Sequence, residues 1–450
     1  MTDAEAFADR LVSAGLDEHD RAAKTMLFRK VLDRWRVDGH AAAGAAWWIP
    51  GRLEVFGTHT DYAGGRALVS AVPRGFVFLS AARSDGRISV VDAGHDGDDN
   101  GVLIDGAASP PRFRGWRHYV EVTAARLARN FPGASLGADV VFASDLPRAA
   151  GMSSSSALVV GTATSLIHAA ALRGRDEWQR NIRSKVDEAG YLACIENGSH
   201  FGTLAGDAGV GTHGGSEDHA AMLAGAAGAC TGFAFVPLRH LDTVPLPSGW
   251  AVVVATSGIG SHKTGTERDA YNRLSDGARA LLQLWNATHP PRASLADALT
   301  AAPSAADDLR DRLRETAIDG WTSDALRDRL DHFVREDARV GEAMIAIRHG
   351  DRHALGRLSD DSQADAEQRL ANQVPETAAL VRVARNAGAF AARSFGAGFG
   401  GSAWALVDAD PAGFAARWLA DYRGVFPDAG SRALAFVAHP GPPVTELEGT

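Results

Sequence analysis

The stretch LPRAAGMSSSSALVVGTA, residues 146–163, carries the strongest indication of fold and chemistry in this sequence. It follows a strand-like run, ADVVFAS at 138–144, and continues into an apolar segment with helical spacing over about 154–172. Small residues at such a junction allow an anion to reach the exposed N–H groups at the start of a helix, where the helix dipole favours negative charge. An ordinary serine N-cap is the alternative, although four consecutive serines exceed what a cap needs. A Walker phosphate loop is excluded, because the GxxxxGK[ST] pattern is absent.

Two further glycine-containing stretches lie on either side of this one in the chain. In PGRLEVFGTHTDYAGG, residues 50–65, Arg52, His59, Asp61 and Tyr62 cluster at the end of a predicted strand, a mixture suited to hydrogen-bonding a polyhydroxylated ligand. A charged turn in which His59 and Asp61 satisfy each other is the alternative. In GAGFGGS, residues 396–402, the glycines indicate a backbone that passes close to a ligand or to another strand. The three stretches together predict a ligand site.

The length of 450 residues favours two domains. The Pro-rich PLPSG near residue 245 separates two strand-like runs, TGFAFVPL and WAVVVATS, so we expect domains over 1–245 and 246–450. Sheet and helix occur in both halves without regular βαβ alternation, which predicts an α+β protein rather than a Rossmann or barrel fold. ALAFVA near the C-terminus is expected to be the last strand, and the Ala-, Asp- and Arg-rich residues 292–318 are expected to be loosely ordered.

Charge and cysteine content exclude several classes of function. The net charge of −9 provides no general basic surface for nucleic acid or an anionic membrane. Two cysteines, Cys194 and Cys230, cannot build a disulfide framework or a structural zinc site. The N-terminus lacks the apolar stretch of a signal peptide, and no apolar run reaches membrane-spanning length. We therefore expect a cytoplasmic protein without nucleic-acid or membrane partners, with monomer and dimer both left open.

The three stretches, in this order, resemble the motifs of the GHMP family of small-molecule kinases, and within it the galactokinases. Gly51-Arg52 followed by residues 57–62 is similar to the galactokinase turn Gly-x-His-Thr-Asp-Tyr. Residues 147–156 are similar to the phosphate motif Pro-x-x-x-Gly-Leu-Ser-Ser-Ser-Ala, and residues 396–402 to Gly-Gly-Gly-Phe-Gly-Gly-Cys. The resemblance implies an N-terminal ribosomal-protein-S5-like domain, a C-terminal ferredoxin-like α+β domain and an active site in the cleft between them. It also implies transfer of phosphate from ATP, with Mg²⁺, to the C1 hydroxyl of galactose or a near relative.

The resemblance assigns roles to individual residues. Asp218, in GGSEDH, resembles the aspartate of the family segment Gly-Ile-Met-Asp-Gln, the presumed catalytic base, and Arg52 resembles its arginine partner. An aspartate beside a guanidinium stays ionised and can accept the proton of a sugar hydroxyl, although a purely structural salt bridge is the alternative. The other implied contacts are Thr58, His59, Asp61, Gly215 and Tyr271 for the sugar; Trp116, Pro147, Gly151, Ser153, Ser154, Ser155 and Ser156 for ATP; and Ser155 and Glu196 for Mg²⁺.

Several departures from the galactokinase pattern fall on the sugar side. Thr58 stands where galactokinases carry the glutamate that binds the 6-hydroxyl, and His219 replaces a glutamine. The segment between Glu196 and Asp218 is longer than usual and contains GTLAGDAGVGTHGG. Two alternatives therefore stay open: a GHMP kinase for a C6-altered or different monosaccharide, and a catalytically silent sugar and ATP sensor. The presence of both Asp218 and Arg52 argues against the sensor.

Overall fold

A large mixed sheet forms the framework of the first half of the chain. The structure is a computed structural model that describes residues 3–40, 44–95, 101–105, 112–260 and 265–447. Within these residues the strands run in the order β12-β1-β2-β5-β3-β4, with β6 beside β2 and β7 beside β6, and only β3 and β5 pair in parallel. The strands are β1 (Ala45–Phe56), β2 (Arg66–Ala82), β3 (Arg87–Asp92), β4 (Gly101–Asp105), β5 (Ala138–Ser144), β6 (Ala229–Ala234), β7 (Arg239–Pro245) and β12 (Thr445–Leu447).

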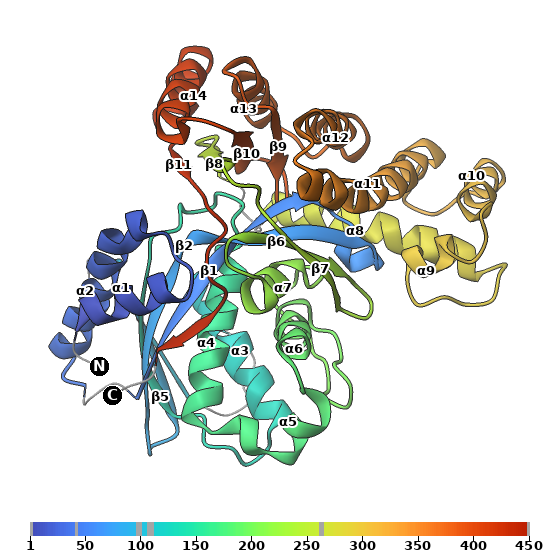
Figure 1. The fold of residues 1–450 in the computed structure, drawn as a ribbon. Coiled ribbons are helices and arrows are strands. Elements are labelled where there is room, and N and C mark those ends of the chain that lie inside the picture. Colours follow the sequence, from blue (N-terminus) through green and yellow to red (C-terminus); the bar gives the residue numbers. More distant parts are fainter. Residues whose placement is uncertain (1–2, 41–43, 96–100, 106–111, 261–264, 448–450) are drawn as a thin grey trace.

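Helices cover both faces of this sheet. Because successive side chains of a strand point to opposite faces, Trp47 of β1 packs into the cluster formed with α3, α4 and α6, whereas Trp48 packs against α1 and α2. Figure 1 shows the same arrangement, with α1 and α2 on one side and α3 to α6 on the other. The helices of this half are α1 (Ala4–Ser13), α2 (Arg21–Val37), α3 (Trp116–Asn130), α4 (Ser154–Ala169), α5 (Asp176–Asn181), α6 (Lys185–Asn197) and α7 (Glu217–Ala224).

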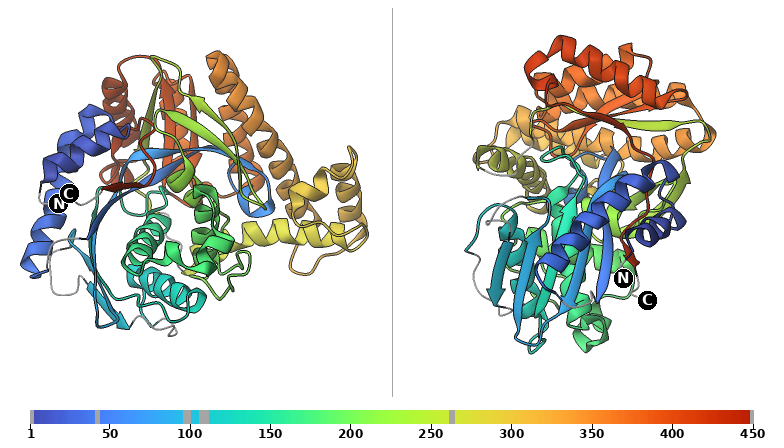
Figure 2. Two further views of the ribbon diagram at one scale, coloured as in Figure 1. Left: turned by 60° about the horizontal axis from the view of Figure 1, so that its bottom comes forward. Right: turned by 90° about the vertical axis from the view of Figure 1, so that its left-hand side faces the viewer.

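A second, antiparallel sheet has the order β11-β8-β10-β9. Ala251 and Val253 of β8 face α13 and α14, whereas Val252 and Val254 join the same core cluster as the first sheet. The two sheets therefore share a core, and Figure 2 shows them as separate layers of one body. Its elements are β8 (Ala251–Thr256), β9 (Ala391–Phe395), β10 (Ser402–Val407), β11 (Ala435–Val437), α12 (Arg352–Asp365), α13 (Pro375–Asn386), α14 (Pro411–Val425) and α15 (Pro427–Gly430).

A helical arm projects from the sheets, seen in yellow and orange in Figure 2. It contains α8 (Gly265–Asn286), α9 (Leu295–Leu299), α10 (Ala305–Glu315) and α11 (Ser323–His349). The expectation of loose order over 292–318 is wrong, because Leu295, Leu309 and Leu313 are buried in a cluster of their own with α8 and α11. Leu309 and Leu313 lie one helical turn apart, so they form an apolar stripe that the charged composition of the segment hides.

The C-terminal residues return to the first sheet. ALAFVA forms β11, as expected, but the last strand is β12, which pairs antiparallel with β1. β7 ends at Pro245 and β8 begins at Ala251, yet β12 belongs to the first sheet, so the division at residue 245 stays a prediction. Among the helices of the described residues, we find none with the length and apolar character needed to cross a membrane.

Candidate active site

Two adjoining cavities lie around the three glycine-containing stretches. The acidic cavity is lined by the carboxyl side chains of Glu54, Asp61, Glu196, Glu217 and Asp218. The aromatic cavity is lined by Trp116, Tyr119 and Phe142 together with serines of the 146–163 stretch. Arg52 and Ala397 line both cavities, so these residues mark the boundary between them.

Arg52 joins three separate segments at this boundary. It lies on β1, donates from Nε to Oδ1 of Asp218 at 2.6 Å and donates from Nη1 to the carbonyl oxygen of Gly151 at 2.8 Å. Burial alone would lower the pKa of Arg52, but the carboxylates of Asp218 and Glu217 raise it above its usual value. The guanidinium therefore stays charged and holds a strand, a loop and a helix together.

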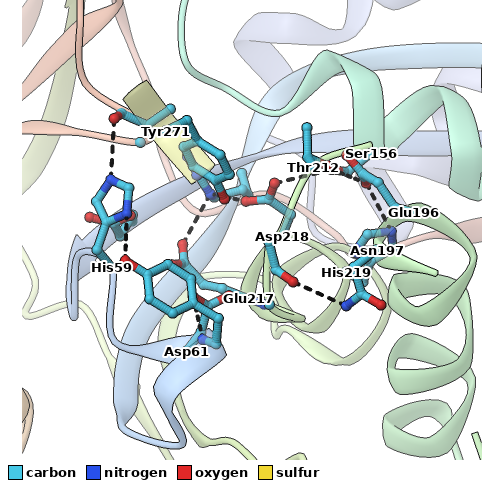
Figure 3. Close-up of a pocket in the computed structure, with 17 residues that line it drawn as sticks. His59, Asp61, Ser156, Glu196, Asn197, Thr212, Glu217, Asp218, His219 and Tyr271 are labelled. Atoms are coloured by element: carbon cyan, nitrogen blue, oxygen red, sulfur yellow. Dashed lines mark hydrogen bonds and ion pairs between the residues drawn. The ribbon is translucent and has the colours of Figure 1, made fainter. Parts of the chain in front are cut away.

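Asp218 lies in the first turn of α7, where the helix dipole favours a carboxylate (Figure 3). Its Oδ2 lies 3.0 Å from the hydroxyl of Ser156, which also lies 2.7 Å from Oε2 of Glu196. A serine hydroxyl has one proton and can donate fully to only one of these carboxylates at a time. Nε2 of the His219 imidazole lies 3.5 Å from Oε2 of Glu196.

The turn after β1 supplies the opposite wall of the acidic cavity. His59 adopts a left-handed φ of 58°, and its ring nitrogens lie 3.1 Å from the hydroxyl of Tyr62 and 3.2 Å from the carbonyl oxygen of Ala397. The 50–65 stretch thus contacts the 396–402 stretch directly. Tyr271 of α8 lies beside His59, with 5.5 Å between the ring centroids.

Asp61 and Glu217 are buried next to each other. Oδ1 of Asp61 accepts a hydrogen bond from the backbone N–H of Tyr62 at 2.8 Å, and Oδ2 accepts one from the N–H of Glu217 at 3.2 Å. Burial nevertheless raises the pKa of Asp61 to about 6. Burial, together with the carboxylate of Glu54, raises the pKa of Glu217 well above its usual value.

Thr58 lies behind the acidic cavity rather than in its wall. It is buried, its hydroxyl is bonded to Glu54 and to Arg393, and it is not among the residues that line the cavity. Glu54 lies two positions from Arg52 on β1, so both side chains are on the same face of the strand, and both line the cavity. The predicted sugar contacts that do line the cavity are His59, Asp61, Gly215 and Tyr271.

The predicted nucleotide residues divide between the cavities. Trp116, Gly151, Ser153, Ser154 and Ser155 line the aromatic cavity. Pro147 lines neither cavity, and Ser156 lines the acidic one. Ser155 and Ser156 line different cavities because both belong to α4, which begins at Ser154, and neighbouring residues in a helix point in different directions.

The predicted metal ligands fit a hard cation in chemistry. Glu196 and the serines offer the carboxylate and hydroxyl oxygens that Mg²⁺ prefers, but the hydroxyl that contacts Glu196 belongs to Ser156, whereas Ser155 faces the aromatic cavity. Within the part of the chain that the structure describes, no group of three or more His, Cys, Asp and Glu side chains is arranged to hold a metal ion.

Sequence reasoning did not assign several residues that line the acidic cavity. Glu54, Asn197 and Thr212 are the clearest cases. Thr212 belongs to the long segment before Asp218, which the sequence marked only as unusual in length. Glu54 lies between Arg52 and the turn, in a predicted strand whose neighbouring residues are apolar. A carboxylate at such a position could have indicated a residue of the site.

Comparison with known families agrees with this arrangement. Residues 118–202 match the family described as GHMP kinases N terminal domain, and residues 343–423 match GHMP kinases C terminal. The structure of Methanococcus jannaschii mevalonate kinase superposes with a TM-score of 0.55 at 12% identity, covering 89% of this chain and 99% of that one. The chain therefore resembles the GHMP kinases in both of their domains and has the two-domain GHMP kinase fold.

Among the GHMP kinases, the chain is similar to galactokinases. Residues 39–82 match the galactokinase galactose-binding signature. The chain is 29% identical to the galactokinase of Roseiflexus sp. (strain RS-1) over 80% of this chain and 82% of that protein, and 29% identical to that of Streptomyces coelicolor over 84% and 88%. The structure of Lactococcus lactis galactokinase complexed with galactose has the same fold, with a TM-score of 0.73 at 21% identity, covering 94% of this chain and 100% of that one.

Proposed function

We propose that this protein is a sugar kinase that transfers the γ-phosphoryl group of ATP to the anomeric C1 hydroxyl of galactose. The galactose-binding signature and the galactokinase relatives support galactose as the acceptor. A hydroxyl acceptor makes the enzyme a phosphotransferase with an alcohol group as acceptor. The same matches favour galactose over a C6-altered sugar, and Thr58, which raised that alternative, does not line the cavity.

The observation that carries this proposal is the position of Arg52 at the boundary between the two cavities. A phosphoryl group has to pass from a nucleotide to a sugar hydroxyl, so the two ligands must meet at one point. Arg52 lies at that point, bonded to Asp218 on the acidic side. Its charge would stabilise the negative charge that spreads over the phosphoryl oxygens during transfer.

Asp218 is the proposed base. Its Oδ1 is held by Arg52, and its Oδ2 faces the acidic cavity beside Ser156. The hydroxyl of Ser156 contacts both Glu196 and Asp218, and Asp218 is proposed to accept the proton of the sugar hydroxyl. His59, Asp61, Gly215 and Tyr271 are proposed to position the sugar against it.

The aromatic cavity is proposed to hold ATP. The ring of Trp116 and the apolar wall around it suit a nucleobase, and the 146–163 stretch lies at the N-terminus of α4, where phosphate oxygens find backbone N–H groups. Mg²⁺, when bound, would neutralise phosphate charge, with Glu196 as its protein carboxylate and a serine hydroxyl beside it.

An ADP-release assay tests the proposal directly. The enzyme is incubated with ATP and Mg²⁺ and with galactose, glucose, mevalonate or no acceptor, and the product is identified by ³¹P NMR. We expect ADP and galactose 1-phosphate with galactose. Sugar binding without ADP release would favour the sensor, and release with a different acceptor would change the assigned substrate.

A further inference from the structure

Glu217 occupies an unusual position in the acidic cavity. It is buried, with 5% of its surface exposed, yet it lines the cavity beside Asp218 (Figure 3). The family segment that this region resembles has methionine at the corresponding position. The carboxyl group at 217 is therefore a feature of this chain that the family pattern does not account for.

The hydrogen bonds around Arg52 leave Glu217 short of a partner. Oε1 of Glu217 lies 3.0 Å from Nε of Arg52, but the single hydrogen on Nε is directed at Oδ1 of Asp218, 2.6 Å away. Oε1 consequently has no hydrogen-bond partner although it is buried. An unsatisfied buried polar atom is costly, so a ligand that supplies a partner gains binding energy.

The other carboxyl groups of the cavity are already engaged. Asp61 accepts two backbone hydrogen bonds, Glu54 is bonded to Thr58, and Glu196 is bonded to Ser156. The surroundings of Glu217 are acidic, since Glu54, Asp61 and Asp218 lie near it and Arg52 is the main cation. Burial in such surroundings favours the protonated carboxyl group, which can donate a hydrogen bond as well as accept one.

We infer that Glu217 is a specificity-determining residue that binds a second hydroxyl of the sugar, distinct from the hydroxyl that faces Asp218. This inference rests on the proposed kinase function and deepens it. Asp218 and Glu217 then have different roles although both contact Arg52. Asp218 acts on the reacting hydroxyl, and Glu217 holds the sugar in the cavity.

Kinetics of two substitutions test the assignment. Glu217→Met removes both hydrogen-bonding atoms, and we expect it to raise KM for galactose about 10- to 100-fold, with kcat and KM for ATP nearly unchanged, because ground-state and transition-state binding are lost equally. Glu217→Gln retains a donor and is expected to recover most of that loss. If Glu217→Met fails to fold, Glu217→Asp, which keeps the acid but shortens its reach, should raise KM in the same selective way.

A set of deoxygalactoses locates the hydroxyl. Sugars lacking the hydroxyl at C2, C3, C4 or C6 are compared in wild type and Glu217→Met. The increase in KM should persist for all of them except the one that lacks the bound hydroxyl, for which the two enzymes should become similar. This coupling distinguishes a direct contact from a structural role.

Three outcomes would overturn the inference: an unchanged KM in Glu217→Met, an equal increase for every deoxygalactose, or a loss of kcat with KM unchanged. The last would mean that Glu217 acts on the reaction through Arg52. An enzyme that phosphorylates no sugar even as wild type would instead refute the proposed function, so the two failures can be told apart.

Discussion

At the scale of single residues, the pair formed by Arg52 and Asp218 is the proposed chemical centre of the site. The guanidinium holds Asp218 by one oxygen and leaves the other beside the acidic cavity. A second carboxyl group, Glu217, shares the same cation without receiving its hydrogen bond. In the proposed mechanism, the charge and the proton position at these residues determine both the reaction and the binding of the sugar.

Replacing the proposed base should separate binding from turnover. Asp218→Asn keeps the shape of the side chain but loses the proton acceptor, so we expect kcat to fall by about 10² to 10⁴. ATP affinity, measured by calorimetry, should stay close to that of wild type. Asp319→Asn, which makes the same change at an exposed position, is the control. Near-full kcat in Asp218→Asn would exclude Asp218 as the base.

The raised pKa of Asp61 predicts a pH-dependent contribution to stability. Its pKa is about 6 in the folded protein, against 3.8 as the ordinary value. An acid with a raised folded pKa stabilises the fold below its unfolded pKa and loses this contribution as pH rises through the folded pKa. The loss between pH 4 and pH 7 amounts to about 2 kcal/mol in the free energy of unfolding.

Asp61→Asn provides the comparison, because an amide does not titrate in this range. We expect the difference in melting temperature between wild type and Asp61→Asn to change with pH, with wild type favoured most near pH 4 and progressively less up to pH 7. A difference that stays constant over this range would show that Asp61 titrates at its ordinary pKa.

At the scale of elements, the start of α7 and the turn after β1 have to approach closely. Gly215 lies just before α7, where a Cβ atom would come within 2.1 Å of Oδ2 of Asp61 and 2.8 Å of the backbone nitrogen of Tyr62. These distances exclude any side chain without displacement of the turn. Glycine is thus required here by close packing between two elements.

Gly215→Ala should therefore displace Asp61 and weaken sugar binding. We expect kcat/KM for galactose to fall at least about tenfold, while KM for ATP changes little because the aromatic cavity is not involved. Gly174→Ala is the matched control, since a Cβ atom there would meet nothing within 4 Å. Equal activity in both variants would mean that the turn tolerates the shift.

At the scale of the whole molecule, one buried carboxylate links the two sheets and the helical arm. Glu336 of α11 is fully buried and accepts hydrogen bonds from the N–H of Gly57 at 2.9 Å, Nη1 of Arg393 at 2.8 Å and the hydroxyl of Ser362 at 2.6 Å. Burial opposes ionisation, but the charges of Arg393 and its neighbours hold the pKa of Glu336 well below its usual range. The position of the 50–65 stretch thus depends on α11 and β9.

Removing this carboxylate should destabilise the entire protein. Glu336→Ala removes the closer of the two carboxylates that pair with the buried Arg393, Glu336 at 2.8 Å rather than Glu54 at 3.5 Å, and we expect a loss of about 3 to 5 kcal/mol in the free energy of unfolding. Glu342→Ala, at an exposed position of the same helix, should change it by less than about 0.5 kcal/mol. Denaturant unfolding of the two variants makes the comparison, and similar stabilities would show that the network is not needed for the fold.

The sequence by itself determined the α+β class, most helices and strands, and the three stretches that form the site. These features depend on local patterns, namely apolar periodicity, glycine positions and a serine-rich helix start, which short windows of sequence contain. Local patterns did not reveal that residues 292–318 form ordered, packed helices or that β12 pairs with β1. Both depend on partners far away in the chain.

Tertiary structure alone decided which chemically similar residues face which cavity. The sequence assigned Ser155 to the metal and Thr58 to the sugar, but their directions follow from the phase of α4 and from the contacts of Thr58 with Glu54 and Arg393. The approach of Glu217 to Arg52 likewise joins residues 165 positions apart in the numbering. A motif specifies which groups are available, whereas their distances, burial and proton state arise only when distant segments pack together.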